Sequence, residues 1–193
     1  KGNFKELVGE NPGMDEVLFD NSILGKLAKI FDGARVVEGI DGALIALNTL
    51  TKVLDYNDVL GGKFYGAKKL LGWYGIVEKE FNKLVNDFKK KKKSKGLVLY
   101  EVKSKYNMKS PLSGYLSKLM QKEVLVIYQK SGKYIEVTFR RGKLSVIDLN
   151  DLAVKVIEKI PDSTGGGHPV ASGARFPVKY LAKFLNNVKK SKI

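Results

Sequence analysis

The spacing of apolar residues changes halfway along the chain, and this change limits the folds that the sequence can adopt. Up to Phe88, apolar residues recur every three or four positions, which is the spacing of an amphipathic helix. We expect one helix that follows a capping Ser22 and stops at Gly33, a second over 43–54, and a third whose apolar stripe runs from Leu70 to Phe88. The first half therefore predicts a helical unit, or the tail of a larger domain.

From Leu97 onward, short β-branched and aromatic runs alternate with helical patterns. Strands are expected at 97–102, 124–128, 134–139 and 144–147. A helix that Pro161 ends, a glycine-rich loop and a last helix follow them. We therefore predict an α/β (α+β) fold in which a helical connector, residues 1–94, precedes a second domain, residues 95–193. This domain should hold a mixed sheet of four to five strands flanked by helices.

Positive charge is concentrated in the second half of the chain. Residues 1–88 hold 11 basic and 13 acidic side chains, whereas residues 89–193 hold 24 basic and 7 acidic ones, and the whole chain carries +15. The two halves meet at a lysine run, 89–93, which suits either a solvated helix end or an arm that contacts phosphates. A domain this basic favours a polyanionic partner, and such binding should weaken steeply with salt.

The composition excludes several kinds of site. The chain has no cysteine and a single histidine, so disulfides, thiolate zinc sites, catalytic cysteines and histidine-rich metal clusters are ruled out. No apolar run is long enough to cross a bilayer and no signal peptide is evident, so we expect a soluble, cytoplasmic protein without a membrane partner. The chain begins with Lys1 rather than Met, which suggests a further segment upstream.

The segment 164–175, Thr-Gly-Gly-Gly-His-Pro-Val-Ala-Ser-Gly-Ala-Arg, has the residues that a phosphate-binding loop needs. Consecutive glycines let the backbone approach an anion and present N–H groups to it. His168, Ser172 and Arg175 add side-chain donors. Neither the Walker motif nor the dinucleotide-binding motif occurs. We favour an anion-binding role for this segment over a plain flexible turn.

The segment resembles the signature of the DHHA1 domain, the substrate-binding module of the DHH phosphoesterase family, in which Gly-Gly-Gly-His precedes small residues and Gly-Ala. The resemblance covers about residues 96–190: Thr138-Phe139-Arg140 stands where the family has Ser-x-Arg, and an Asp-led helix from Asp148 precedes the glycines. Within the family the sequence is most similar to the archaeal RecJ-like exonucleases, since the segment 173–177, Gly-Ala-Arg-Phe-Pro, precedes a helix with Phe184-Leu185.

In that family the loop and the arginine face the active site and hold the phosphate or the terminal nucleotide of the substrate. The resemblance implies this role for Arg140, Thr138, Gly165, Gly166, Gly167, His168, Ser172 and Gly173. We add Arg175 because of its charge and its place beside the loop. Tyr134, Phe139 and Phe176 are weaker candidates for stacking on bases.

No catalytic residue and no metal ligand is assigned in this chain. DHH enzymes hold two metal ions, Mn²⁺ or Mg²⁺, with Asp and His residues of another domain, and this sequence has neither an Asp-His-His nor an Asp-x-Asp motif. Asp148 and Asp151 are better suited to the start of a helix.

Two functions stay open. The first is the C-terminal part of a RecJ-like exonuclease that grips single-stranded nucleic acid or a small nucleotide for a metal site on another domain. The second is a non-catalytic replication factor that binds single-stranded DNA, GINS and the replicative helicase. Whether the chain belongs to an enzyme is thus undecided by its sequence. A purely RNA-binding module, as in alanyl-tRNA synthetase, is the least favoured function.

Overall fold

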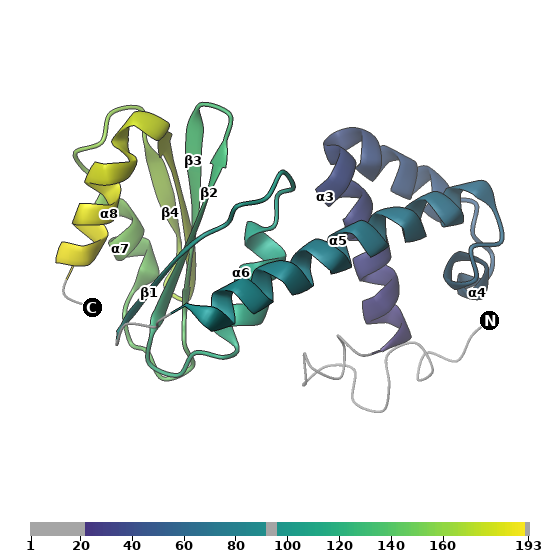
Figure 1. Ribbon diagram of the computed structural model, residues 1–193, viewed down its shortest axis with the longest axis horizontal. Coiled ribbons are helices and arrows are strands. Elements are labelled where there is room, and N and C mark those ends of the chain that lie inside the picture. Colours follow the sequence, from purple (N-terminus) through teal and green to yellow (C-terminus); the bar gives the residue numbers. More distant parts are fainter. Residues whose placement is uncertain (1–21, 92–95, 192–193) are drawn as a thin grey trace. The chain divides into compact units, whose positions relative to one another are not determined.

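The computed structural model describes residues 22–91 and 96–191, which form two compact units that divide between Glu80 and Phe81 (Figure 1). One long helix, α5 (Tyr65–Lys90), contributes residues to both units. The domain boundary expected after residue 94 lies outside the described residues, as does part of the lysine run, so both stay predictions. None of the described helices has the length and apolar character that a membrane span requires.

The first unit consists of helices, as the apolar spacing predicts. It contains α3 (Ile23–Leu50), the short α4 (Tyr56–Leu60) and the first part of α5. Ser22 caps α3, because its Oγ accepts a hydrogen bond from the backbone N–H of Gly25 at 3.0 Å. The core between these helices is made by Leu27, Ile30, Ala34, Ala46, Val59, Leu70 and Trp73.

The prediction that Gly33 ends the first helix is wrong. Gly33 lies buried inside α3, where a Cβ atom would come within 3.3 Å of the backbone of Tyr74 on α5. The glycine therefore permits close packing of the two helices rather than a turn. The break in α3 occurs at Gly39, whose φ of 63° and ψ of −133° are not helical.

The second unit is built on one mixed sheet of five strands, as predicted. The strands are β1 (Leu97–Glu101), β2 (Val124–Ser131), β3 (Tyr134–Arg141), β4 (Thr164–His168) and β5 (Ala171–Pro177). Their order across the sheet is β1-β2-β3-β5-β4. β1 runs parallel to β2, and the other neighbouring strands are antiparallel.

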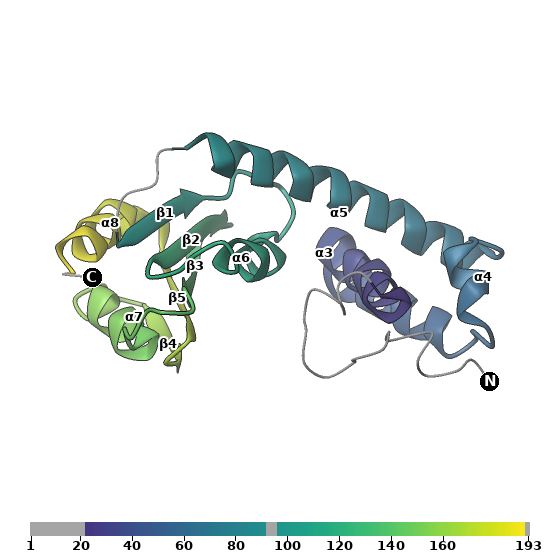
Figure 2. The ribbon, with the colours of Figure 1, turned by 90° about the horizontal axis from the view of Figure 1, so that it is seen from below.

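One face of the sheet is covered by α7 (Leu149–Ile157) and α8 (Leu181–Lys190), and the short 3-10 helix η1 (Val178–Tyr180) leads into α8 (Figure 2). Asp148 caps α7, because its Oδ1 accepts hydrogen bonds from the backbone N–H groups of Asn150 and Asp151. Apolar residues of all these elements form the main core: Val124, Val126, Ile135, Val137, Phe139, Leu149, Leu152, Ala153, Val156, Ile157, Ile160, Ala174, Phe176, Phe184 and Val188.

The opposite face is covered over only part of its width. There α6 (Lys109–Ser117) packs on β2 and β3, and the end of α5 packs on β1 through the rings of Phe88 and Tyr100, whose centroids are 5.2 Å apart. On the same side, residues of β3, β5 and β4 remain accessible to solvent. We call this part of the sheet, which carries Thr138, Arg140, Gly173, Arg175, Gly166 and His168, the open face.

The segment 144–147 is not the strand that its residues predict. The backbone N–H of Gly142 donates to the carbonyl of Glu123, and that of Leu144 donates to the carbonyl of Gln121. The chain after β3 is therefore held against the turn that precedes β2 and does not extend the sheet. Leu144 and Val146 are 62% and 92% exposed, whereas Ser145 is buried and Ile147 is partly buried against the main core.

Candidate phosphate-binding site

The register of β3, β5 and β4 aligns residues of the open face in three rows. Written from β3 through β5 to β4, the rows are Arg140-Ala171-His168, Thr138-Gly173-Gly166 and Glu136-Arg175-Thr164. Directly paired residues of antiparallel strands project to the same face of a sheet. The fold therefore brings Arg140 and Thr138, from one segment, to the same surface as His168 and Arg175, from another.

The glycine-rich segment is a β-hairpin and not the loop that the sequence predicts. Gly166 and Gly167 pair with β5 at φ values of 145° and 150°, which residues with a side chain rarely adopt. A Cβ atom at Gly167 would lie 2.8 Å from the carbonyl oxygen of Ala171, and one at Gly165 would lie 2.6 Å from Cδ1 of Ile157. The glycines are thus needed for β4 to pack on β5 and α7.

The backbone N–H of Gly167 is already used inside the unit. It donates to the side-chain oxygen of Asn150, in the first turn of α7, at 3.0 Å. This amide therefore holds the hairpin to α7 and is not presented to a ligand. What the glycines give the open face is a floor without side chains, on which an anion can approach the backbone.

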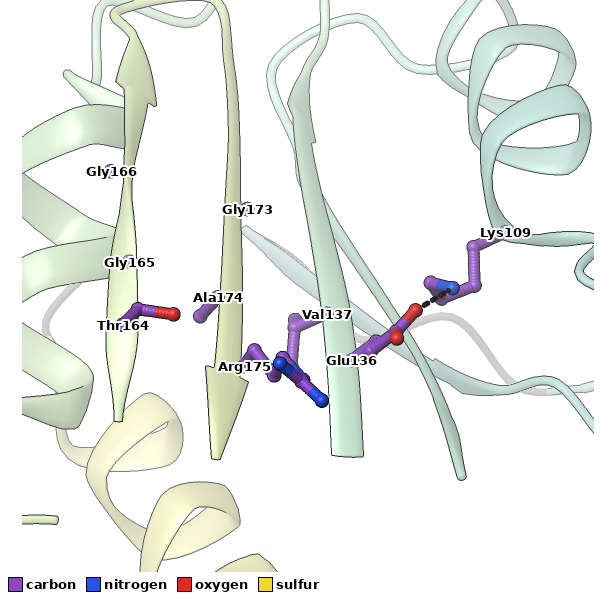
Figure 3. A pocket seen from close by; sticks show the side chains of 9 residues that line it. All are labelled: Lys109, Glu136, Val137, Thr164, Gly165, Gly166, Gly173, Ala174 and Arg175. Atoms are coloured by element: carbon purple, nitrogen blue, oxygen red, sulfur yellow. Dashed lines mark hydrogen bonds and ion pairs between the residues drawn. The ribbon is translucent and has the colours of Figure 1, made fainter. Parts of the chain in front are cut away.

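A cleft of about 530 Å³ lies on this floor (Figure 3). Its lining comes from α6 and from the three strands of the open face: Lys109, Glu136, Val137, Thr164, Gly165, Gly166, Gly173, Ala174 and Arg175. Four of the nine predicted binding residues are among them, namely Gly165, Gly166, Gly173 and Arg175.

Sequence reasoning missed Lys109, Glu136 and Thr164. Lys109 is the first residue of α6, and its Nζ donates to Oε2 of Glu136 at 2.6 Å and to Oδ1 of Asn107 at 2.8 Å. The hydrogen bond from Lys109 lowers the pKa of the Glu136 carboxyl, and the charges of Lys109 and Arg175 act in the same direction against partial burial. Glu136 is thus a carboxylate held between two cations.

Arg175 is exposed and leans on an aromatic ring. Its guanidinium lies 3.9 Å from the ring centroid of Tyr134, two positions before Glu136 on β3. A planar cation stacked on an aromatic ring keeps its N–H groups available around its edge. Arg175 therefore has both a fixed position and donors for a bound anion.

The remaining predicted residues lie outside the lining of the cleft. Arg140 and Thr138 are half-buried and His168 is exposed, all on the open face. Ser172 is 7% exposed and alternates to the covered face, where its Oγ donates weakly to the carbonyl of His168 at 3.5 Å. The structure thus brings together the predicted residues except Ser172, whose side chain faces the core, and Gly167, whose N–H is engaged.

Two of the aromatic candidates cannot stack on bases. Phe139 and Phe176 are fully buried, and both contact Phe184 of α8 in the main core. Tyr134 stays on the open face, but one side of its ring is taken by Arg175. The alternation of apolar and polar residues along β3 explains this division between the faces.

Within residues 22–91 and 96–191, no group of three or more His, Cys, Asp or Glu side chains could hold a metal ion. Asp148 and Asp151, which the sequence suggested for a helix start, are both in that place. The described part of the site contains cationic hydrogen-bond donors and a glycine backbone without side chains. These features suit the binding and orientation of an anion.

Comparison with known proteins identifies the family of the second unit. The family model of the DHHA1 domain matches residues 96–191. A search of curated proteins finds no match.

Solved structures share the fold at low sequence identity. RecJ from Thermus thermophilus in complex with Mg²⁺ is similar, with a TM-score of 0.61, 15% identity, and coverage of 96% of this chain and 27% of RecJ. A pGpG-specific phosphodiesterase from Vibrio cholerae has a TM-score of 0.53 and 13% sequence identity. The match covers 83% of this chain and 56% of the enzyme. An exonuclease RecJ bound to manganese has a TM-score of 0.56 and 14% sequence identity. That match covers 95% of this chain and 42% of the exonuclease.

The chain thus spans about a quarter of the length of the Thermus RecJ. The matched range, 96–191, contains all five strands, the glycine hairpin and the open face. Residues 96–191 are therefore a DHHA1 domain of the DHH phosphoesterase family, and the fold of the chain is like that of RecJ.

Proposed function

We propose that this DHHA1 domain is the substrate-binding part of a DHH-family phosphodiesterase, and that its open face holds the phosphate or the terminal nucleotide of single-stranded nucleic acid. The observation that carries the proposal is the alignment of Arg140 and Thr138 on β3 with Gly173, Gly166 and His168 of the hairpin. These are the residues for which the family resemblance implies phosphate binding, and they share one accessible surface beside a cleft.

The chemistry of this surface suits a phosphate. Arg140 and Arg175 carry guanidinium groups, which bind phosphate oxygens through paired N–H bonds. The glycines allow close approach to the backbone, Thr164 adds a hydroxyl group to the lining of the cleft, and Thr138 adds another on the same face of the sheet. The excess of basic residues in 89–193 attracts polyanions from a distance.

Hydrolysis in this proposal belongs to a metal site outside the described residues, because these offer no set of ligands for one. The DHHA1 domain binds the strand and orients it. The fold shared with a RecJ that holds Mg²⁺ supports a two-metal partner domain. The narrower part of the proposal is that the whole protein is an exonuclease of the archaeal RecJ-like group.

Binding is tested with a fluorescently labelled, single-stranded octanucleotide that carries a 5′-phosphate. We expect fluorescence anisotropy to report binding. The logarithm of the association constant should fall linearly with the logarithm of the salt concentration. Amide shifts in NMR spectra should change at Gly165, Gly166 and Gly173 when a nucleoside 5′-monophosphate is added. Salt-independent binding, or amide shifts confined to other parts of the domain, would contradict the proposal.

A nuclease assay with Mn²⁺ separates the two functions that the sequence leaves open. A RecJ-like exonuclease should degrade a single strand when the full-length gene product is used. A non-catalytic replication factor should bind the strand without degrading it, and it should also bind GINS and the helicase. The second result would remove hydrolysis from the proposal and leave the binding role in place.

A further inference from the structure

A second cavity lies beside the predicted site, at the end of the sheet. It measures about 410 Å³ and is lined by the β2–β3 turn, the end of β5, η1 and the turn before β4: Lys130, Gly132, Lys133, Tyr134, Asp162, Pro177, Val178 and Lys179. Three lysines and one carboxylate residue, Asp162, are among its lining, so the lining has a net positive charge. Neither the motif nor the family resemblance assigns these residues a role.

A stacked pair of side chains links the linings of the two cavities. Arg175 lines the cleft on the open face, Tyr134 lines the second cavity, and the guanidinium lies 3.9 Å from the centroid of the ring. Tyr134 pairs with Pro177, one row beyond the pair of Glu136 with Arg175. Two residues of a strand advance about 7 Å, a length that one extended nucleotide also spans.

The walls of the second cavity are fixed in place. The backbone N–H of Val178 donates to the carbonyl of Lys133 at 3.0 Å, which ties η1 to the β2–β3 turn. The ammonium groups of Lys133 and Lys179 each lie over a tyrosine ring, 5.8 Å from Tyr134 and 5.0 Å from Tyr180. Lys133 and Lys179 are therefore held by an ordered backbone and by aromatic contacts, and both remain exposed to solvent.

Asp162 is a further unusual feature of this cavity. Among the described residues it is the only one other than glycine with a positive φ, 53°. Asp and Asn tolerate this conformation better than other residues with a side chain. Its carboxylate lines a cavity that is otherwise cationic, where it opposes the binding of an anion.

We propose that this second cavity binds the next phosphate of the strand whose end lies on the open face, so that the domain grips an oligonucleotide through two successive subsites. The inference rests on the proposed function and deepens it, because it makes the preferred ligand a strand of several nucleotides rather than a free nucleotide. The backbone passes over the Arg175–Tyr134 pair from one subsite to the other.

The test uses the whole chain with two ligands, the 5′-phosphorylated octanucleotide and a nucleoside 5′-monophosphate, which has no second phosphate. The triple variant Lys130→Gln, Lys133→Gln, Lys179→Gln should bind the octanucleotide about tenfold more weakly at low salt and with a smaller salt dependence. Its affinity for the monophosphate, measured by NMR, should not change. A control variant, Lys155→Gln, Lys159→Gln, Lys189→Gln, removes the same charge from exposed positions on and beside α7 and α8.

The variant Asp162→Asn adds a test in which binding is expected to increase, a result that loss of folding cannot produce. It removes the opposing carboxylate while keeping a residue that accepts the positive φ, so it should tighten octanucleotide binding about two- to threefold. Equal losses in the two triple variants, or no gain from Asp162→Asn, would overturn the second subsite. Absence of any monophosphate binding to the unchanged protein would instead refute the proposed function itself, which keeps the two failures distinguishable.

Discussion

The Nζ of Lys109 lies 2.6 Å from Oε2 of Glu136, which ties the first residue of α6 to the middle of the sheet at the edge of the cleft. Lys109 is 7% exposed, so its ammonium group depends on this carboxylate and on Asn107 for the hydrogen bonds that water would otherwise provide. The pair fixes the distance between α6 and β3 and so shapes one wall of the cleft.

We therefore predict that Glu136→Gln destabilises the chain by about 1–3 kcal/mol at neutral pH, because it leaves a buried cation with a neutral partner. The folded protein lowers the pKa of Glu136 below its ordinary value of 4.5. The stabilisation is hence complete above that value and is lost as the pH falls through the lower pKa of the folded state. Urea unfolding of both proteins along a pH series measures the difference.

The control for this prediction is Glu101→Gln, which removes an exposed carboxylate 3.7 Å from Lys103. An exposed ion pair contributes little to stability. The free energy of unfolding of this variant should therefore stay close to that of the unchanged protein at every pH. A gap between Glu136→Gln and the unchanged protein that is constant down to acid pH would mean that the glutamine disturbs packing rather than charge.

The sequence allowed prediction of the parts of the site that lie within one segment. The glycine hairpin stands out because runs of glycine, histidine and arginine are rare in plain connectors. Along β3, Glu136, Thr138 and Arg140 alternate with buried Ile135 and Val137, so the same pattern could have identified Glu136. The sequence suggested a loop at 164–175, where no alternation of faces applies, whereas in the hairpin the side chain of Ser172 faces the core.

Other features depend on contacts between distant segments. Lys109 reaches the cleft only because α6 packs on β3, 27 residues further along the chain, and no local pattern announces that contact. Leu47 and Leu50 lie within the helical pattern over 43–54, yet they are 58% and 52% exposed. Periodicity indicates that a face is apolar, but it does not indicate what covers that face.

Gly167→Ala should destabilise the domain, because the new Cβ would lie 2.8 Å from the carbonyl oxygen of Ala171 at a backbone φ of 150°. A loss of about 1–3 kcal/mol is expected from the strained backbone. Gly114→Ala in α6 is the matched control, since a Cβ there meets no atom within 4 Å. It should be neutral or stabilising by up to about 1 kcal/mol. Thermal unfolding would compare the two, and similar melting temperatures would show that the hairpin relaxes around a side chain.

His168→Ala and Ser172→Ala test the assignment of faces within one hairpin. His168 is exposed on the open face, so its replacement should weaken single-strand binding about fivefold while leaving the melting temperature unchanged. Ser172 faces the core and makes one weak hydrogen bond, so its replacement should leave binding unaffected. Anisotropy titrations with both variants decide the matter. A larger binding loss for Ser172→Ala than for His168→Ala would place the ligand on the wrong side of the sheet for our proposal.

Arg140→Ala should weaken binding of a short 5′-phosphorylated strand by about 1–3 kcal/mol, because a charged hydrogen bond to phosphate is lost. Arg140 is the row partner of Ala171 and His168, and it is the only cationic residue of β3 that projects to the open face. Lys155→Ala removes one charge from α7, on the far side of the sheet, and should change the affinity less than twofold by the reduced field alone. Both variants should also be titrated at several salt concentrations. For Arg140→Ala, the slope of the logarithm of the association constant against that of the salt concentration should be less steep, by the amount expected for about one phosphate contact. An unchanged slope together with an unchanged affinity would remove Arg140 from the site.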